Sequence, residues 1–389
     1  MAQKKLEVRS QVDLKGNETG VEVDDTSSDD AERIDEPFDP EDIDVVTRSM
    51  TVDLLLSRVQ SNMIDLQPDF QRRWGIWDQR RKSRLIESLL LRIPLPVLYA
   101  AEDDNESWEI VDGIQRLSTI AKFINPELLG ESEPLVLSEM EYLKDYNGKK
   151  FAQLSPRLKL RLRETELVIH LIRKGTPAEV KFNIFARINT GGVALSSQEL
   201  RHAITPGPAR NILEEWATKP TFLKATDNSV RSTRMDDREL VLRFLAFLDG
   251  GQRRYKSADI DGFLIAAMKR INGLTPREIR DAEKSFAGAM NAAFEIFEKN
   301  AFRKRFQSGA SRMPINKALF ESISVSLSEM NQEQIERLIK NKHSVQKDFI
   351  ALCNDRGFEA SISQGTGDIA KVNRRFDSIR KLFHEGANR

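Results

Sequence analysis

The spacing of apolar side chains divides the chain into three stretches. Residues 1–45 hold few large apolar side chains in no regular period, so they cannot bury enough surface to offset the loss of chain entropy, and we predict disorder. In residues 46–205, short apolar runs are mixed with segments of helical spacing, which predicts an α/β unit. In residues 206–389, apolar side chains follow helical spacing almost throughout, which predicts a helical unit. The predicted fold class is therefore α+β.

Capping and turn residues locate individual elements. Asp78 can cap the start of one helix, and Ser196 with Glu199 forms a capping-box pattern at the start of another. Pro68 removes a backbone donor from the run 64–70, which is therefore expected to be a sheet edge or an ordered loop. Helices are predicted for residues 51–60, 78–91, 113–124, 176–188 and 196–204. Strands are predicted for residues 95–100, 107–112, 134–139 and 166–172.

Composition narrows the class of protein. The 389 residues include one cysteine, Cys353, which excludes an internal disulfide and a multi-cysteine metal site and is typical of a reducing cytosol. No stretch approaches the roughly 18 consecutive apolar residues that a membrane span needs. Residues 1–20 lack the apolar run of a secretory signal. We expect a cytoplasmic protein without a membrane partner.

Charge is distributed unevenly although the formal net charge is zero. Residues 1–45 carry fifteen acids and five bases, a net charge of −10, which leaves +10 on residues 46–389. A basic body attracts polyanions such as nucleic acid or nucleotide phosphates. The acidic tail could compete for that surface as an intramolecular mimic, or it could be a solubilising extension, which we favour.

The junction at Asp112 and Gly113 is the first candidate for chemistry. An apolar strand leads through Gly113 into a helix, whose first turn would present unpaired N–H groups and the positive end of the helix dipole to a phosphate. Arg116 in that turn could clamp a phosphate with two hydrogen bonds. Asp112 could hold a metal ion, polarise a water or accept a ribose hydroxyl. The alternative is a capped junction in which Asp112 accepts from backbone N–H groups, and the spacing alone favours it.

Two further segments could contact nucleotides. Residues 72–84 contain six cations, with Trp74 and Trp77 among them, which suits contact with a nucleotide or a nucleic acid. The alternative is a solvated helix face with inward-packed tryptophans. The run Asn189-Thr190-Gly191-Gly192 could form an anion-binding nest, or it could be a helix C-cap.

Several common catalytic patterns are absent from the sequence. It has no G-x-x-x-x-G-K-[ST] loop, so it is not a P-loop NTPase. Its four histidines form neither H-E-x-x-H nor a His-Asn-His nuclease pattern. It also has no G-x-S-x-G elbow.

Taken in order, these motifs resemble the GmrSD-type N-terminal domain family. The resemblance begins with Leu66-Gln67-Pro68-Asp69-Phe70-Gln71-Arg72 and Lys82-Ser83-Arg84-Leu85-Ile86-Glu87. It continues through Val111-Asp112-Gly113-Ile114-Gln115-Arg116 and Phe185-Ala186-Arg187-Ile188-Asn189-Thr190-Gly191-Gly192. Leu195-Ser196 with Glu199-Leu200-Arg201 follows, and the helical run from Asp237 to Phe244 is also similar.

The resemblance implies a fold and a site. It implies a small mixed-sheet ParB/sulfiredoxin-like domain over residues 46–205, followed by a mostly helical domain over residues 206–389. It implies that a nucleoside triphosphate is handled with Mg²⁺, with the metal at Asp112. The implied catalytic residues are Asp112, Gln115 and Arg116, and the implied phosphate-binding residues are Gly113, Gln71, Arg72, Lys82, Asn189, Thr190 and Gly191. The family commonly has glutamine where this chain has Ile114.

The resemblance also implies a class of function. It implies a nucleotide-binding, nucleotide-hydrolysing regulator or sensor in a prokaryotic DNA-targeting defence system. The expected partners are DNA, through the basic body, and a separate nuclease subunit, because no His-Asn-His nuclease domain is visible. Two alternatives remain: a non-enzymatic module that binds DNA or protein, and a DNA nickase.

Overall fold

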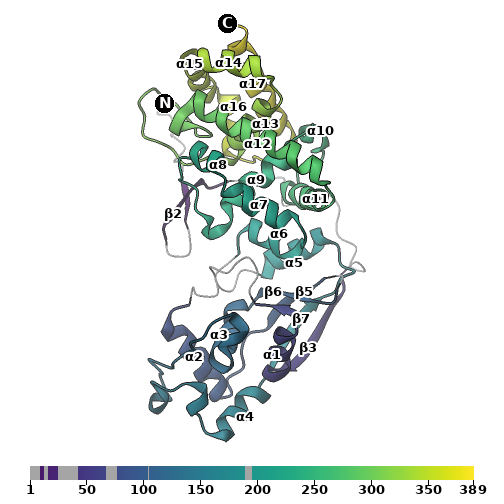
Figure 1. Cartoon of the computed structure of the whole chain (residues 1–389), viewed down its shortest axis with the longest axis vertical. Coiled ribbons are helices and arrows are strands. Elements are labelled where there is room, and N and C mark those ends of the chain that lie inside the picture. The colour runs from purple at the N-terminus through teal and green to yellow at the C-terminus, as the bar shows by residue number, and fades with distance from the viewer. Residues whose placement is uncertain (1–8, 13–15, 25–42, 67–76, 104, 189–194) are drawn as a thin grey trace. The chain divides into compact units, whose positions relative to one another are not determined.

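The computed structural model describes residues 9–12, 16–24, 43–66, 77–103, 105–188 and 195–389. The chain forms two compact units: one is Phe38–Ala194, and the other combines Met1–Pro37 with Leu195–Arg389. The first is mixed α/β and the second is mostly helical, which confirms the α+β class (Figure 1). Within the described ranges, no helix combines the length and the apolar character needed to cross a bilayer.

A five-stranded mixed sheet forms the centre of the α/β unit. Its strand order is β3-β7-β5-β6-β4. The pairs β3/β7 and β5/β6 are antiparallel, while β7/β5 and β6/β4 are parallel. The strands are β3 (Val45–Thr51), β4 (Ile64–Asp65), β5 (Leu98–Glu102), β6 (Trp108–Asp112) and β7 (Glu166–Ile172).

Five α-helices accompany this sheet. The apolar faces of the first four share one core with it, in which Ile86, Leu117, Ile120 and Ile169 are fully buried. Asp78 caps α2 by accepting a hydrogen bond from the Arg81 N–H at 2.7 Å, as its sequence position predicts. The helices are α1 (Val52–Gln60), α2 (Gln79–Leu90), α3 (Ile114–Ile124), α4 (Pro156–Glu164) and α5 (Ala178–Ile188).

The strand predicted for residues 134–139 does not form. The Leu135 N–H donates to the Lys122 carbonyl at 3.2 Å and the Leu137 N–H to the Lys149 carbonyl at 3.0 Å, so these backbone groups pair with a helix end and a loop. Both leucines are buried. The alternation of apolar and polar residues over 134–139 therefore predicts correctly which side chains are buried, but the backbone of this segment does not pair with a strand.

The second unit is built around two fully buried helices, α9 and α13. Every residue of α9 is buried, as is every residue of α13 except Ser328. Phe286 of α12 packs against Trp216 and Phe244, with ring centroids 5.3 and 5.1 Å apart. The helices are α6 (Ser197–Ile204), α7 (Ala209–Ala217), α8 (Pro220–Ala225), α9 (Asp236–Phe247), α10 (Gly251–Arg254), α11 (Ile260–Asn272), α12 (Pro276–Phe297), α13 (Lys317–Ser328), α14 (Gln332–Lys340), α15 (Lys342–Cys353), α16 (Arg356–Ser363) and α17 (Ile369–Ala387).

Part of the acidic N-terminal segment is ordered, contrary to the prediction for residues 1–45. Strands β1 (Ser10–Val12) and β2 (Glu18–Glu22) pair antiparallel. Val21 is fully buried and forms a parallel bridge with Ile315. Glu22 forms a 2.6 Å ion pair with Lys304. The prediction failed for this part because the segment's acids find buried cations nearly 300 positions later, which local composition cannot reveal.

Candidate functional site

The predicted strand–helix junction exists at Gly113. Strand β6 ends at Asp112 and α3 begins at Ile114, with Gly113 between them at φ 95°. A side chain at this positive φ is strained, and a Cβ on Gly113 would also press on the Leu98 side chain, so the junction favours glycine. The first turn of α3 therefore begins directly at the end of β6, where its N–H groups have no intrahelical acceptor.

Arg116 is held by protein groups at this junction. Its Nη2 donates to the Val97 carbonyl at 3.2 Å and to Asp112 Oδ2 at 3.0 Å, and its Nη1 donates to the Pro96 carbonyl. The side chain is only 10% exposed. Burial lowers the pKa of the guanidinium, and the charge of Asp112 opposes that shift. Arg116 thus ties the segment before β5 to the start of α3.

Asp112 is the more accessible member of this pair. Its side chain is 49% exposed. Oδ2 accepts from Arg116, whereas no hydrogen bond to Oδ1 occurs in the part of the chain that the structure describes. Gln115 lies one turn away, and its backbone carbonyl accepts from the Thr119 hydroxyl at 2.6 Å. Of the predicted residues, the structure therefore pairs Asp112 with Arg116 beside Gly113, and Gln115 lies in the same turn of α3.

Lys82 is not part of this group. Burial lowers its pKa, and the nearby charge of Lys122 lowers it further. Lys122 lies in the last turn of α3, about 12 Å along the helix from its start at 1.5 Å per residue. The charges that act on Lys82 thus include one at the far end of α3, and none of them is Asp112 or Arg116. The other predicted residues, Gln71, Arg72, Asn189, Thr190 and Gly191, lie outside the described residues.

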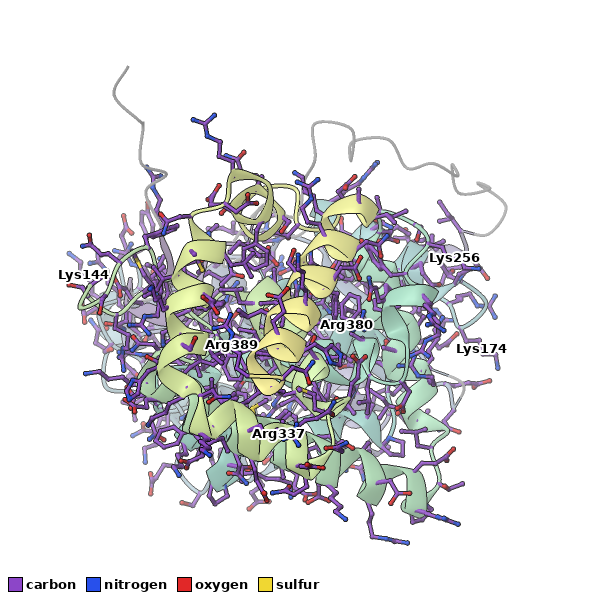
Figure 2. The ribbon with its side chains drawn as sticks, turned by 90° about the horizontal axis from the view of Figure 1, so that it is seen from above. Lys144, Lys174, Lys256, Arg337, Arg380 and Arg389 are labelled. Carbon is purple, nitrogen blue, oxygen red and sulfur yellow. The ribbon has the colours of Figure 1, made fainter. Side chains whose placement is uncertain are left out.

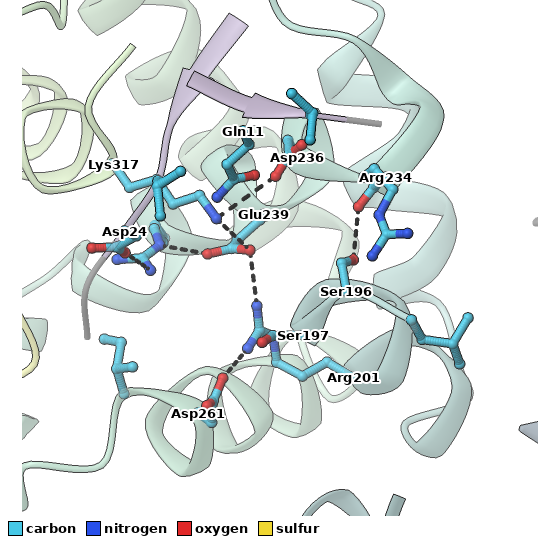
Figure 3. Close-up of a pocket in the computed structure, with 15 residues that line it drawn as sticks. Gln11, Asp24, Ser196, Ser197, Arg201, Arg234, Asp236, Glu239, Asp261 and Lys317 are labelled. Atoms are coloured by element: carbon cyan, nitrogen blue, oxygen red, sulfur yellow. Dashed lines mark hydrogen bonds and ion pairs between the residues drawn. The ribbon is translucent and has the colours of Figure 1, made fainter. Parts of the chain in front are cut away.

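A second candidate site, which the sequence analysis missed, lies inside the helical unit. It is a pocket of about 420 Å³ (Figure 3). Residues at the starts of four helices line it: Ser197 of α6, Asp236 of α9, Ile260 of α11 and Lys317 of α13. Its cations are Arg201, Arg234, Arg243 and Lys317, and its acids are Asp24, Asp236, Glu239 and Asp261.

Glu239 is the centre of the ion pairs in this pocket. It lies 3.1 Å from Arg201, 2.9 Å from Arg243 and 3.0 Å from Lys317, each distance joining a nitrogen to a carboxylate oxygen. These three cations belong to three different helices, α6, α9 and α13, and Figure 3 shows Arg201 and Lys317 reaching Glu239 from two of them. Burial would raise the pKa of Glu239, but Lys317, Arg243 and Arg201 outweigh that effect and lower it.

Asp236 has a different environment. It is 2% exposed, its Oδ2 atom accepts no hydrogen bond from the described residues, and its Oδ1 atom lies 3.7 Å from Lys317 Nζ. Burial raises its pKa to about 6. The available sequence signal was charge on a buried helix, because Arg243 interrupts the apolar run 240–247 and four charged residues directly precede that run.

Metal ligands are sparse in the described residues. They contain no group of three or more His, Cys, Asp and Glu side chains placed to hold a metal ion. A Mg²⁺ ion at the junction would therefore rely on Asp112 together with ligand oxygens, which is a usual arrangement for this ion with phosphates.

Comparison with known proteins finds one family match, which covers most of the α/β unit. No curated protein and no solved structure matches the chain. The family model of the GmrSD restriction endonuclease N-terminal domain matches residues 53–205, a range that contains the junction at Gly113 and extends through α6. The description of this family names a restriction endonuclease. Residues 53–205 belong to the GmrSD restriction endonuclease N-terminal domain family.

Proposed function

We propose that the α/β unit binds a nucleoside triphosphate by its phosphates at the first turn of α3 and hydrolyses it. In this proposal the chain is a regulator or sensor in a DNA-targeting, restriction-type defence system. The observation that carries it is the strand–helix junction at Gly113, which places the N-terminal turn of α3 beside the half-exposed carboxylate of Asp112 in a domain of the GmrSD family.

The proposed chemistry uses two parts of the junction: the first turn of α3 and the carboxylate of Asp112. The N–H groups and dipole of the first turn of α3 attract an anion. A Mg²⁺ ion held by Asp112 Oδ1 would neutralise phosphate charge. Arg116 already donates to Pro96, Val97 and Asp112, so we assign it a positioning role. It holds Asp112 and the preceding loop in place without direct phosphate contact.

We also propose that DNA is the macromolecular partner, bound through exposed cations. Lys144, Lys174 and Lys256 extend from the ribbon in Figure 2, and none of the three forms an ion pair with the described part of the chain. Residues 46–389 carry a net charge of +10, which favours contact with a phosphate backbone. A separate nuclease subunit remains the proposed source of any strand cleavage.

Isothermal titration calorimetry of the full chain tests the nucleotide site. ATP, GTP, CTP and UTP are titrated with and without Mg²⁺ into the wild type, Asp112→Asn and Glu133→Gln. Glu133 is the matched control, since its side chain is an 83% exposed carboxylate of the same unit. We expect Mg²⁺-dependent binding of at least one nucleotide, weakened about tenfold or more by Asp112→Asn, the loss of one charged contact.

Two results would contradict the proposal. If no nucleotide binds, or if Asp112→Asn and Glu133→Gln behave alike, the site is wrong. Phosphate release is measured in the same samples. Tight binding without release would contradict the hydrolytic part alone and leave a nucleotide-binding module.

A further inference from the structure

The acidic N-terminal segment places one carboxylate inside the pocket of the helical unit. Asp24 Oδ2 lies 2.7 Å from Arg243 Nη2, and Asp24 Oδ1 accepts from the Thr366 hydroxyl at 2.6 Å. The Asp24 side chain is 10% exposed. Figure 3 shows Asp24 on the same side of the pocket as Lys317. Asp24 thus occupies an anion position made by a guanidinium and a hydroxyl.

Asp24 is not needed to hold its segment in place. The Glu22 N–H donates to the Ile315 carbonyl at 2.7 Å, and the Glu22 side chain contacts Lys304 at 2.6 Å and Asn316 at 2.9 Å. Val21 is fully buried. These contacts anchor β2 to the helical unit before the chain reaches Asp24. The carboxylate of Asp24 is therefore an additional feature of the pocket rather than the anchor of the strand.

Arg243 does not need Asp24 as a counter-ion. Its Nε lies 2.9 Å from Glu239 and its Nη1 lies 3.0 Å from Glu321. Asp24 is thus a third carboxylate on one guanidinium, and like charges at this spacing repel one another. The pocket must supply further positive potential to hold it.

The lining supplies that potential. Without Asp24, it has four cations and three acids, a formal charge of +1. The starts of α6, α9, α11 and α13 also line the pocket, and each helix N-terminus carries roughly half a positive charge. Arg201 and Arg243 are 1% and 3% exposed, so water screens their charges little. The volume of about 420 Å³ is in the range of small-molecule sites.

We propose that this pocket binds a phosphate-bearing small ligand and that Asp24 is the chain's own occupant of its anion position. The ligand's phosphate takes the place of the Asp24 carboxylate beside Arg243 and Thr366. Asp24 is then an intramolecular competitor that lowers the apparent affinity of the site. This site lies within the helical unit and does not depend on nucleotide binding at α3.

Calorimetric titration of inorganic phosphate, pyrophosphate and ATP into full-length variants tests the proposal. Asp24→Ala removes the competitor, and Asp24→Asn removes its charge but keeps an acceptor for Thr366. Glu18→Ala is the matched control, because Glu18 is an exposed acid on the same segment. We expect pyrophosphate to bind both Asp24 variants about tenfold or more tighter than the wild type, and Glu18→Ala to match the wild type. The three ligands distinguish a free phosphate or pyrophosphate from a nucleotide as the source.

Hydrogen exchange of the same complexes locates the ligand. The proposal predicts slower exchange at residues 236–243 and 317–320 on pyrophosphate binding. Equal affinity in the wild type and both Asp24 variants, or no binding to any of them, would overturn it. An equal gain in Glu18→Ala would also overturn it, because net charge would then explain the effect. If the chain binds Mg²⁺–ATP at α3 but fails these tests, only the proposal for the pocket of the helical unit is refuted.

Discussion

Replacing Arg116 by methionine tests whether its guanidinium positions the junction. Arg116→Met keeps an unbranched side chain but removes the bonds to the Pro96 and Val97 carbonyls and to Asp112. A hydrogen bond to a charged group contributes about 1.5–3 kcal/mol, so two lost carbonyl contacts are worth about 3 kcal/mol or more. The Asp112 pair adds little, since that carboxylate is half exposed and screened by water.

Local opening of the segment before β5 is the quantity to measure. A loss of about 3 kcal/mol corresponds to about a hundredfold faster amide exchange at residues 97–101, at about 1.4 kcal/mol per tenfold. Arg163→Met is the control, because Arg163 is half exposed and its ion pair with Asp53 is 3.7 Å long. Exchange in Arg116→Met at the wild-type rate would show that these contacts do not hold the junction. The positioning role of Arg116 would then be refuted.

Three further predictions concern the two sites and the acidic segment. Gly113→Ala should lower the free energy of urea unfolding by about 1 kcal/mol or more and abolish nucleotide binding, because alanine is strained at this positive φ and its Cβ would press on Leu98. Unfolding and nucleotide binding like those of the wild type would contradict this. Burial raises the pKa of Asp236, which faces Lys317 and Glu239, from 3.8 to about 6. The protonated Asp236 side chain therefore stabilises the folded chain below pH 4, and this contribution to stability is lost as the pH rises through 6. Asp236→Asn should therefore gain about 3 kcal/mol relative to the wild type between pH 4 and 7, and a pH-independent difference in unfolding free energy would refute the assignment. If the acidic segment competes for the basic surface, replacing the nine acids of residues 25–42 by amides should tighten DNA binding at low salt, with a gain that shrinks as salt rises; equal affinities are expected of a solubilising extension.

Features with local causes could be predicted from the sequence. The capping box of α6 is one: the Ser196 hydroxyl accepts from the Glu199 N–H at 3.2 Å, and Glu199 accepts from the Ser196 N–H at 2.6 Å. The turn at Gly113 is another, because a glycine between a strand and a helix pattern is a local signal. Caps and turns involve residues three or four positions apart, so a single sequence carries the information.

Features with distant partners could not be predicted. Whether Arg116 faces a ligand or protein carbonyls depends on Pro96 and Val97, twenty and nineteen positions earlier. The order of the N-terminal segment depends on Lys304, 282 positions beyond Glu22. In both cases the charge was visible in the sequence, but its partner was set by the tertiary fold.

Nucleotide-dependent hydrogen exchange tests the central claim, phosphate binding at the first turn of α3, most directly. The wild type and Asp112→Asn are compared with and without the Mg²⁺–nucleotide that binds most tightly. The account predicts that the nucleotide slows exchange of the amides of residues 113–117 in the wild type, and slows it far less in Asp112→Asn. Unchanged exchange at residues 113–117 in a nucleotide-saturated wild type would contradict it.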